Sequence, residues 1–307
     1  MRCSYCGAEF EVPENVVIAV CPYCGTSVIT VTGEKVKEHY VFRLNYDFNI
    51  AFKKLLSVIS KEIGVPRDLT QKISIKERRL HYIPLYIYRI EVYAVLNGKK
   101  ISEEVKDIAT LAVEKTPVPV PLGYKFPVRG KEYFNPEIVK KGVYYSPTLN
   151  PEKVLEKVEE EYKGKVLKEA ELELGSSPLE TGVKIVSKSR YLGFAIYPFW
   201  EIVYTYEKGE YRGFVDGADG IVIYSEYPKK FGKRPAILLT TLLTTSTLIG
   251  FITPLAIYRN LQAAVYGLIG GLLVSTPSLV KLLSKSFGSK GEYFLEVEKI
   301  GISEEIR

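Results

Sequence analysis

The spacing of apolar residues predicts an amphipathic helix in each half of the chain. The first spans 47–63, where Asp47 serves as the cap and a Gly-Val-Pro sequence stops the helix. The second spans 150–163, where Asn150 caps, a proline takes the first helical position and Gly164 ends the helix. The apolar stripes consist of Phe48, Phe52, Leu55, Leu56, Ile59 and Ile63 in the first helix and Val154, Leu155, Val158 and Tyr162 in the second.

Extended segments follow each helix. Asn97-Gly98 is a strong hairpin signal, because both residues tolerate the left-handed backbone of a tight turn. Over 169–174, alanine and leucine alternate with glutamate, which predicts a half-buried strand with its glutamates in water. The predicted strands cover 73–80, 82–96, 169–174, 197–206, 211–215 and 221–224.

Two long apolar runs near the C-terminus predict a hairpin of transmembrane helices. Residues 236–258 hold no charged side chain, Arg259 and Asn260 interrupt, and 261–280 form a second such run. A hydrocarbon core of about 30 Å needs about 20 helical residues, so each run is long enough for one crossing. A buried helical hairpin in a water-soluble protein is the alternative, although two such runs in succession are rare there.

The charges around these runs predict an orientation. Seven cations flank the hairpin against one in its turn, which places both ends in the cytoplasm. The expected localisation is therefore the cell membrane, with two passes, a cytoplasmic body and a cytoplasmic tail at 281–307. The expected partners are the lipid bilayer and its anionic headgroups. The flanking cations are Lys229, Lys230, Lys233, Arg234, Lys281, Lys285 and Lys290.

All four cysteines lie within the first 24 residues, in a C-x2-C-x14-C-x2-C array. Two thiolates separated by two residues can bind one ion, and the glycine after each pair provides the open backbone of a knuckle. Two knuckles complete a closed tetrahedral site, which predicts structural Zn²⁺ in a ribbon over 1–34. Disulfides and a rubredoxin-type iron centre are the alternatives. The predicted ligands are Cys3, Cys6, Cys21 and Cys24.

The charge of this segment disfavours nucleic acid. Residues 1–33 carry Arg2 as their only lysine or arginine, against three glutamates. Phosphate binding depends on lysine and arginine displacing counterions, so we expect the ribbon to contact protein or to stabilise the fold. Tyr5, Phe10 and Tyr23 are candidate contact rings, with structural packing as the alternative.

The two halves resemble each other. Each contains an apolar-Pro-apolar-aromatic sequence, Ile83-Pro84-Leu85-Tyr86 and Tyr197-Pro198-Phe199-Trp200, which indicates internal duplication or chance similarity of two α+β units. The second unit resembles the PepSY domain family in its short helix, its strand and the Tyr-Arg-Gly-Phe-Val-Asp-x-x-x-Gly-x-Val hairpin at 211–222. With the ribbon and the apolar runs, the chain resembles uncharacterised prokaryotic zinc-ribbon membrane proteins.

The predicted fold class is therefore α+β, with a zinc ribbon, two PepSY-like units of helix plus antiparallel sheet, and a transmembrane hairpin. That family's peptide- and protease-binding roles outside the cell are not expected here, because the predicted topology faces inward. The predicted domains are 1–34, the ribbon; 40–115, the first unit; 116–149, a Pro-rich linker; 150–228, the second unit; then 236–258, 261–280 and 281–307.

No catalytic constellation is present in the sequence. His39 and His81 stand outside any ligand-spaced pattern and are expected to be ordinary surface or strand residues. The turn at 216–220 superficially resembles a calcium loop, but its second aspartate is one position late and Tyr227 stands where a bidentate acid belongs. There is no phosphate-binding glycine loop, no Gly-x-Ser-x-Gly elbow and no spare cysteine. We therefore expect no enzyme activity.

Two functions remain as hypotheses. The first is a membrane-anchored adaptor or membrane-complex subunit on the cytoplasmic face, binding an unknown protein or peptide; Tyr197 and Trp200 would then lie either at an exposed edge or, as favoured, in the core. The alternative is a membrane-tethered factor that binds nucleic acid or acts in transcription. Its basis is the ribbon together with Lys76, Arg78, Arg79, Lys99 and Lys100.

Overall fold

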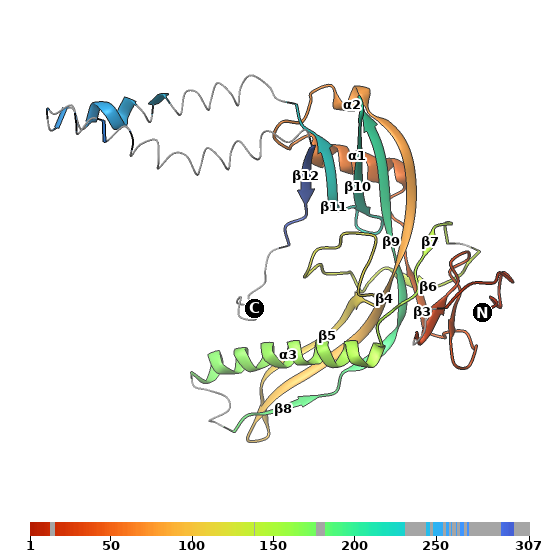
Figure 1. Ribbon diagram of the computed structural model, residues 1–307. Helices are drawn as coiled ribbons and strands as arrows, with labels where there is room; N and C mark the ends of the chain where they lie inside the picture. The colour runs from red at the N-terminus through yellow and green to blue at the C-terminus, as the bar shows by residue number, and fades with distance from the viewer. Residues whose placement is uncertain are drawn as a thin grey trace.

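A long curled sheet dominates the computed structural model of the chain (Figure 1). The structure describes residues 1–12, 16–137, 139–175, 182–230 and 290–297, with 244–245, 248–253, 256–257, 259, 262, 265–266 and 269. Strands β1 (Ile18–Val20) and β2 (Ser27–Ile29) form a separate two-stranded sheet in the ribbon. The ten strands of the main sheet are β3 (His39–Phe42), β4 (Ser74–Leu96), β5 (Lys99–Leu111), β6 (Lys131–Tyr133), β7 (Val143–Tyr144), β8 (Lys184–Ser187), β9 (Arg190–Tyr206), β10 (Gly209–Asp216), β11 (Val222–Pro228) and β12 (Lys290–Phe294).

Helix α1 (Phe48–Ile59) begins where the sequence predicts it. The Ile50 backbone N–H donates a hydrogen bond of 2.9 Å to Asp47 Oδ1, which confirms the predicted cap. The helix ends at Ile59, before the predicted glycine stop, and Ile63 at the end of the predicted stripe is 87% exposed. A short helix α2 (Leu69–Lys72) precedes β4.

Helix α3 (Pro151–Leu174) is longer than the sequence predicts and includes the segment predicted as a strand. Tyr162, Val166 and Ala170 recur at steps of four and are the buried residues of this helix, whereas Leu172 is 84% exposed. The alternation at 169–174 was therefore misleading, because alanine, glutamate, leucine and lysine all favour a helix and only one apolar position in each turn contacts the sheet. Gly175 ends the helix with a left-handed backbone.

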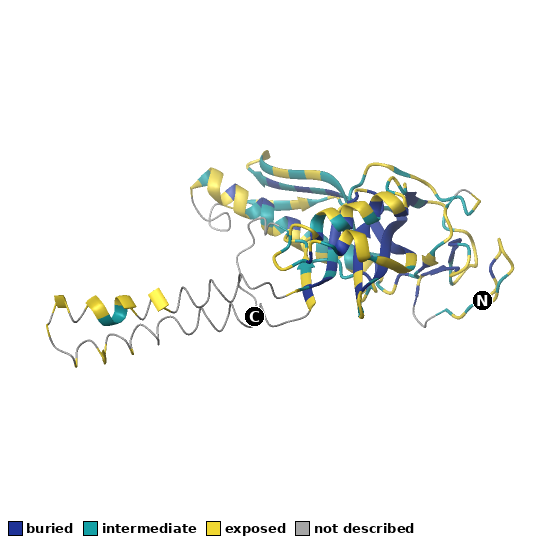
Figure 2. Ribbon diagram, turned by 90° about the horizontal axis from the view of Figure 1, so that it is seen from above, coloured by how far each residue is buried: buried dark blue, intermediate teal, exposed yellow. Residues whose placement is uncertain are grey.

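Strands β4 and β9 run antiparallel beside each other along the centre of the sheet (Figure 1). The two segments predicted at 73–80 and 82–96 form one continuous strand. Successive residues of both strands alternate between two buried clusters, one on each face of the sheet. Figure 2 shows buried positions gathered along these strands. On β4, Tyr82, Tyr86 and Tyr88 belong to one cluster and Ile83, Leu85 and Ile87 to the other.

The two similar halves of the chain interlock. Apart from α2 in the first half and β8 in the second, the order β3, α1, β4, β5 is repeated as β7, α3, β9, β10. The two proline-containing sequences lie opposite each other, with Ile83 paired to Tyr197. β3 pairs parallel with β9, and β7 pairs parallel with β4. Helix α1 packs on β10 and β11, whereas α3 packs on β4 and β5. Each helix thus covers the hairpin of the other half, and the predicted fold class of two α+β units with a transmembrane hairpin is wrong.

The range predicted as a Pro-rich linker contributes to the sheet and its core. β6 pairs with β3, and β7 pairs with β4. Val118, between two prolines, is fully buried against one face of the sheet, as is most of Phe126. This segment therefore covers a sheet face that would otherwise present apolar residues to water.

The transmembrane hairpin is also corrected. None of the helices that the structure describes is long and apolar enough to cross a membrane. Most of both predicted spans lies outside the described residues. The predicted two-pass membrane localisation, with both termini cytoplasmic, is therefore contradicted by the described helices, and the lipid contact stays a prediction.

The described part of the predicted tail returns to the sheet. β12 pairs antiparallel with β11, and Lys290 lies opposite Pro228. The strand occupies 290–294, within the segment predicted as a cytoplasmic tail. The chain therefore leaves the described body at 230 and re-enters it at 290 at the same edge of the sheet.

Candidate metal centre

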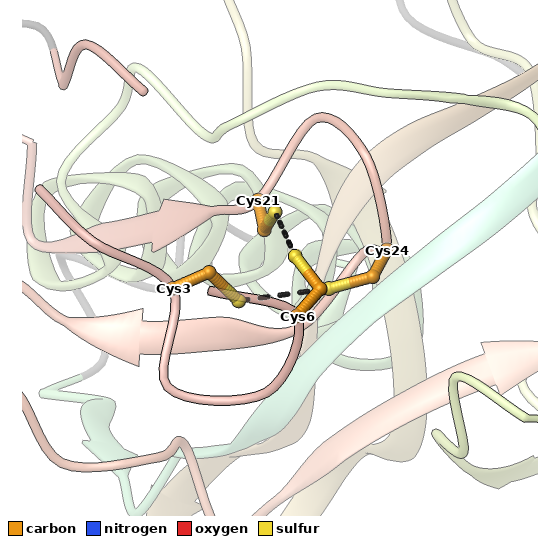
Figure 3. Close-up of side chains that lie close together, drawn as sticks. All are labelled: Cys3, Cys6, Cys21 and Cys24. Atoms are coloured by element: carbon orange, nitrogen blue, oxygen red, sulfur yellow. Dashed lines mark hydrogen bonds between the residues drawn. The ribbon is translucent and has the colours of Figure 1, made fainter. Parts of the chain in front are cut away.

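The side chains of all four cysteines converge at the N-terminal end of the chain (Figure 3). Their sulfur atoms lie within 4.8 Å of one another. Sγ of Cys3 is 3.6 Å from Sγ of Cys24, and Sγ of Cys6 is 3.7 Å from Sγ of Cys21. Each close pair joins one thiol from each knuckle, so neither knuckle forms the cluster alone.

The two knuckles have the same backbone hydrogen bonds. In the first, the Gly7 N–H donates to the Cys3 carbonyl at 3.1 Å; in the second, the Gly25 N–H donates to the Cys21 carbonyl at 2.9 Å. Both glycines have positive φ, +73° and +76°, a backbone that L-residues rarely adopt. The glycine after each cysteine pair was thus a correct signal of a folded-back turn.

The sulfur spacing fits a tetrahedral ion and excludes disulfides in this arrangement. A thiolate–zinc bond of about 2.3 Å gives tetrahedral sulfur–sulfur edges of about 3.8 Å, close to the two short distances observed here. A disulfide requires about 2.05 Å, and all four cysteines are free thiols. The four predicted residues therefore form a cluster compatible with a metal site, as the sequence indicated.

The environments of the thiols differ. Burial raises the pKa of Cys21 to about 12, against two backbone hydrogen bonds from its own knuckle. Burial also acts on Cys3, but backbone N–H groups of Cys6 and Tyr5 outweigh it and lower its pKa to about 7. Burial raises the pKa of Cys24 despite a contact of 3.3 Å between its Sγ and Thr26 Oγ1. A cation that binds here must displace protons from Cys21 and Cys24, whose pKa values are raised. Its binding therefore depends on pH.

The second knuckle packs directly on the body of the protein. A Cβ added at Gly25 would lie 2.6 Å from the Tyr144 ring and 2.8 Å from the Phe134 ring, so only glycine fits there. Ser146 Oγ accepts a hydrogen bond of 3.0 Å from the Val20 N–H. No pattern in the sequence marks Phe134 or Tyr144 for this role, because they lie more than a hundred residues from the knuckle.

His39 links the ribbon to the sheet. Its Nδ1 is 2.8 Å from Ser27 Oγ of β2, and its ring stacks on Phe134 with centroids 4.3 Å apart. Its Nε2 is the one buried side-chain polar atom of the described residues without a hydrogen-bond partner. Burial lowers the pKa of His39 to about 3 from an ordinary value of 6.5. The residue is a strand histidine, as predicted, but it is buried at a junction.

This burial predicts an acid-dependent loss of stability. Between pH 6.5 and pH 3 the unfolded chain binds a proton at His39 and the folded chain does not, so stability should fall as the pH is lowered through this window. At pH 5 the loss from this group amounts to about 2 kcal/mol. Urea unfolding of the metal-loaded wild type and of His39→Phe at pH 5 and pH 7 measures it. The wild type should lose more stability than the variant, and parallel losses would contradict the assignment.

The two knuckle tyrosines point outward. Tyr23 is 65% exposed and Tyr5 is 44% exposed, with its hydroxyl 3.3 Å from Glu137 Oε1. Phe10 is half-buried. The apolar residues of β1 pack instead into the body, where Ile18 and Val20 join the main core. The ribbon thus buries its strands against the sheet and leaves its knuckle rings exposed.

Other residues selected from the sequence lie elsewhere and are structural. Tyr197 is fully buried and Trp200 is 4% exposed, which confirms the favoured core interpretation. His81 Nε2 is 2.8 Å from Glu201 Oε2, and its Nδ1 is 2.8 Å from the Tyr145 hydroxyl. No pattern in the sequence predicted these contacts of His81 with Tyr145 and Glu201.

The turn that resembled a calcium loop is occupied by its own hydrogen bonds. Oδ1 of Asp216 accepts from the backbone N–H groups of Ala218 and Asp219, at 2.7 and 2.8 Å. Oδ2 accepts from the hydroxyls of Tyr124 and Tyr197. Both carboxylate oxygens therefore have two donors each, and the aspartate stabilises the turn.

The cations that prompted the nucleic-acid hypothesis do not form one surface. Lys76 and Arg79 lie near the start of the 23-residue strand β4, whereas Lys100 lies beyond its far end. Lys76 pairs with Glu210, Arg79 with Glu77, and Lys100 with Glu103. Cations separated and paired in this way offer little to a phosphate backbone.

No family model matches this chain, and searches of curated proteins and of solved structures find no similar protein. The resemblance to the PepSY family therefore stays a prediction.

Proposed function

We propose that the four cysteines hold one structural Zn²⁺ and that the protein is a non-enzymatic adaptor that binds a protein partner through the exposed rings of its ribbon. The observation that carries this proposal is the pair of knuckles, which point four sulfurs inward and Tyr5 and Tyr23 outward. Four cysteine ligands leave an ion no open coordination position, which suits a structural role. Tetrahedral thiolate sites suit both zinc and iron, and zinc is the choice for a structural site because it carries no redox chemistry.

The charge of the ribbon defines the chemistry of the partner. Residues 1–33 carry one arginine and three glutamates, a formal charge of −2, whereas the whole chain carries +6, which leaves +8 for residues 34–307. Four thiolates on one Zn²⁺ make the ribbon more negative by two further charges. Exposed tyrosine rings on a negatively charged ribbon favour lysine and arginine side chains, which pair with carboxylates and stack on aromatic faces, as Lys35 already does over the Tyr5 ring at 5.9 Å. The partner is therefore a basic protein segment.

The metal assignment is tested first, by metal analysis and native mass spectrometry of the purified full chain. One zinc ion per chain is expected, removable by chelation, and one iron ion per chain with thiolate-to-iron absorption would contradict the choice of zinc.

Partner binding is tested with three fluorescent probes: a lysine- and arginine-rich peptide, a glutamate-rich peptide of equal length, and duplex DNA. The full chain should bind the basic peptide, and Tyr23→Ala should weaken that binding about tenfold while zinc content stays unchanged, which corresponds to about 1.4 kcal/mol. Phe294→Ala is the matched control, because Phe294 is 53% exposed on β12, outside the ribbon. Preference for DNA with a steep salt dependence would favour the nucleic-acid hypothesis instead, and equal binding by Tyr23→Ala would refute the ribbon as the contact surface.

A further inference from the structure

We propose that metal binding at the four cysteines controls a site on the opposite face of the sheet. An ion on the cysteines fixes residues 144–146, and these residues keep water from a buried His81–Glu201 pair on that face. This proposal rests on metal binding by the ribbon but not on the identity of the ion or on any partner. It makes metal occupancy a conformational control of the body, in addition to a stabiliser of the ribbon.

The first step is the contact between the second knuckle and the body. Gly25 lies so close to the rings of Tyr144 and Phe134 that a methyl group there would overlap both, at 2.6 and 2.8 Å. The corresponding Gly7 of the first knuckle has only the end of Arg2 nearby, at 3.9 Å. The backbone of the second knuckle is held by the cysteines on either side of it, so its shape depends on the cluster that an ion would fix. The ring of Tyr144 therefore packs against a surface that the metal defines.

Ser146 also contacts the ribbon, through two hydrogen bonds to the backbone of Val20. Ser146 Oγ accepts from the Val20 N–H at 3.0 Å and donates to the Val20 carbonyl at 3.3 Å. Val20 immediately precedes the ligand Cys21 in the chain. Residues 144 and 146 are thus both held by the ribbon, on either side of Tyr145.

The second step crosses the sheet. Neighbouring residues of an extended chain point to opposite faces. Tyr144 stacks on Tyr82 of β4, with centroids 4.8 Å apart, and belongs to the cluster on the ribbon side. Tyr145 packs against the other cluster, and its hydroxyl is 2.8 Å from Nδ1 of His81. Because 144 and 145 share one peptide unit, a displacement of Tyr144 also displaces Tyr145.

The third step is the group that Tyr145 closes. Glu201 is 5% exposed; His81 holds its Oε2, and Arg212 Nε lies 3.2 Å from its Oε1. Arg79 and Arg212 are each about half exposed, so the carboxylate lies just below the surface. Burial lowers the pKa of His81 despite the adjacent carboxylate. Release of Tyr145 would open this pair to water and free charged groups on the face opposite the ribbon.

The experiment uses the full chain and its two histidines as reporters. Deuterium exchange at the imidazole C2 position, read by mass spectrometry, reports the access of water to His81 and to His39 separately. With metal bound, exchange at His81 should be slow; after chelation it should accelerate at least fivefold, together with backbone exchange at 144–146. Backbone exchange of β11 and β12, at the edge of the sheet, should stay protected.

Two glycine variants distinguish loss of the contact between the second knuckle and the body from backbone strain within a knuckle. Gly7→Ala and Gly25→Ala impose a similar positive-φ penalty, but only Gly25→Ala pushes on Tyr144 and Phe134. In the metal-loaded state, Gly25→Ala should accelerate His81 exchange and Gly7→Ala should not. Tyr145→Phe keeps the ring but removes the hydroxyl, and should give fast exchange at His81 with or without metal.

The outcomes distinguish this inference from the proposed function. A chain that binds its ion but exchanges His81 at the same rate before and after chelation refutes the coupling and leaves the metal site intact. General loss of protection, including β11 and β12, also refutes it, because the ion would then stabilise the whole fold and not residues 144–146 alone. A wild type that binds no metal overturns the proposed function, a result that metal analysis reports before any exchange is measured.

Discussion

Cys21→Ser should abolish stoichiometric metal binding and cost the protein several kcal/mol of stability. Cys21 is fully buried, and its sulfur lies 3.7 Å from that of Cys6. A serine hydroxyl is a poor ligand for zinc and would also leave a polar group in the space of a buried sulfur. Metal binding contributes about 10–16 kcal/mol to the folding of isolated zinc fingers, so much of the order of the ribbon depends on it.

Metal analysis after gel filtration and urea unfolding of the full chain measure this effect. The variant should retain less than a tenth of an equivalent of metal, and its first unfolding transition should move to lower urea. Ser4→Ala is the matched control, because Ser4 is an exposed residue of the first knuckle and is not a ligand. Retention of one tightly bound ion by Cys21→Ser would contradict the assignment of this thiol as a ligand.

The cluster of four cysteines could be predicted from the sequence, because the geometry of each knuckle is local. Two residues between cysteines and a glycine after each pair suffice to define a knuckle, and both knuckles form as expected. The surface under the second knuckle could not be predicted. Phe134 and Tyr144 meet Gly25 only after β6 and β7 have joined the sheet, and no short-range pattern in the sequence marks such a contact.

The same distinction applies to the fold. Asp47 and Asn150 were correctly predicted as helix caps, since a cap depends on hydrogen bonds to residues two or three positions away. The Asn97-Gly98 turn also forms as expected between β4 and β5. The pairing of β4 with β9 and the exchange of helices between the halves involve residues more than a hundred positions apart. The two halves share an order of elements, and their similarity in sequence did not indicate how they combine.

The incorrect predictions came from patterns that two structures share. Alternating glutamates at 169–174 suit a strand, but Ala170 also continues the four-residue spacing of α3 and is buried there. Pro84 and Pro198 both lie inside the central strands, where Pro84 is opposite Ile196 and Pro198 is opposite Tyr82. The two apolar runs in the sequence are long enough for a membrane span. None of the described helices, however, is long and apolar enough to cross a membrane.

Asp216→Ala should be the most damaging single substitution in the body, with a loss of about 4 kcal/mol or more. The carboxylate is fully buried and accepts four hydrogen bonds, two from backbone N–H groups and two from tyrosine hydroxyls. Alanine would leave these donors without acceptors, and each buried unsatisfied donor costs about 1–3 kcal/mol. Tyr124 comes from the Pro-rich segment and Tyr197 from β9, so the aspartate also ties that segment to the sheet.

Asp216→Asn and Tyr124→Phe separate the contributions of charge and of the individual donors. The amide keeps the volume and one acceptor oxygen, and tyrosine hydroxyls can accept from its N–H groups, so Asp216→Asn should cost far less than alanine. Tyr124→Phe removes one donor and leaves the carboxylate three, so it should cost about 1 kcal/mol. Thermal and urea unfolding of the three variants give the order. If Asp216→Ala were as stable as Asp216→Asn, the hydrogen-bonded carboxylate would not be what holds the turn and the Pro-rich segment in place.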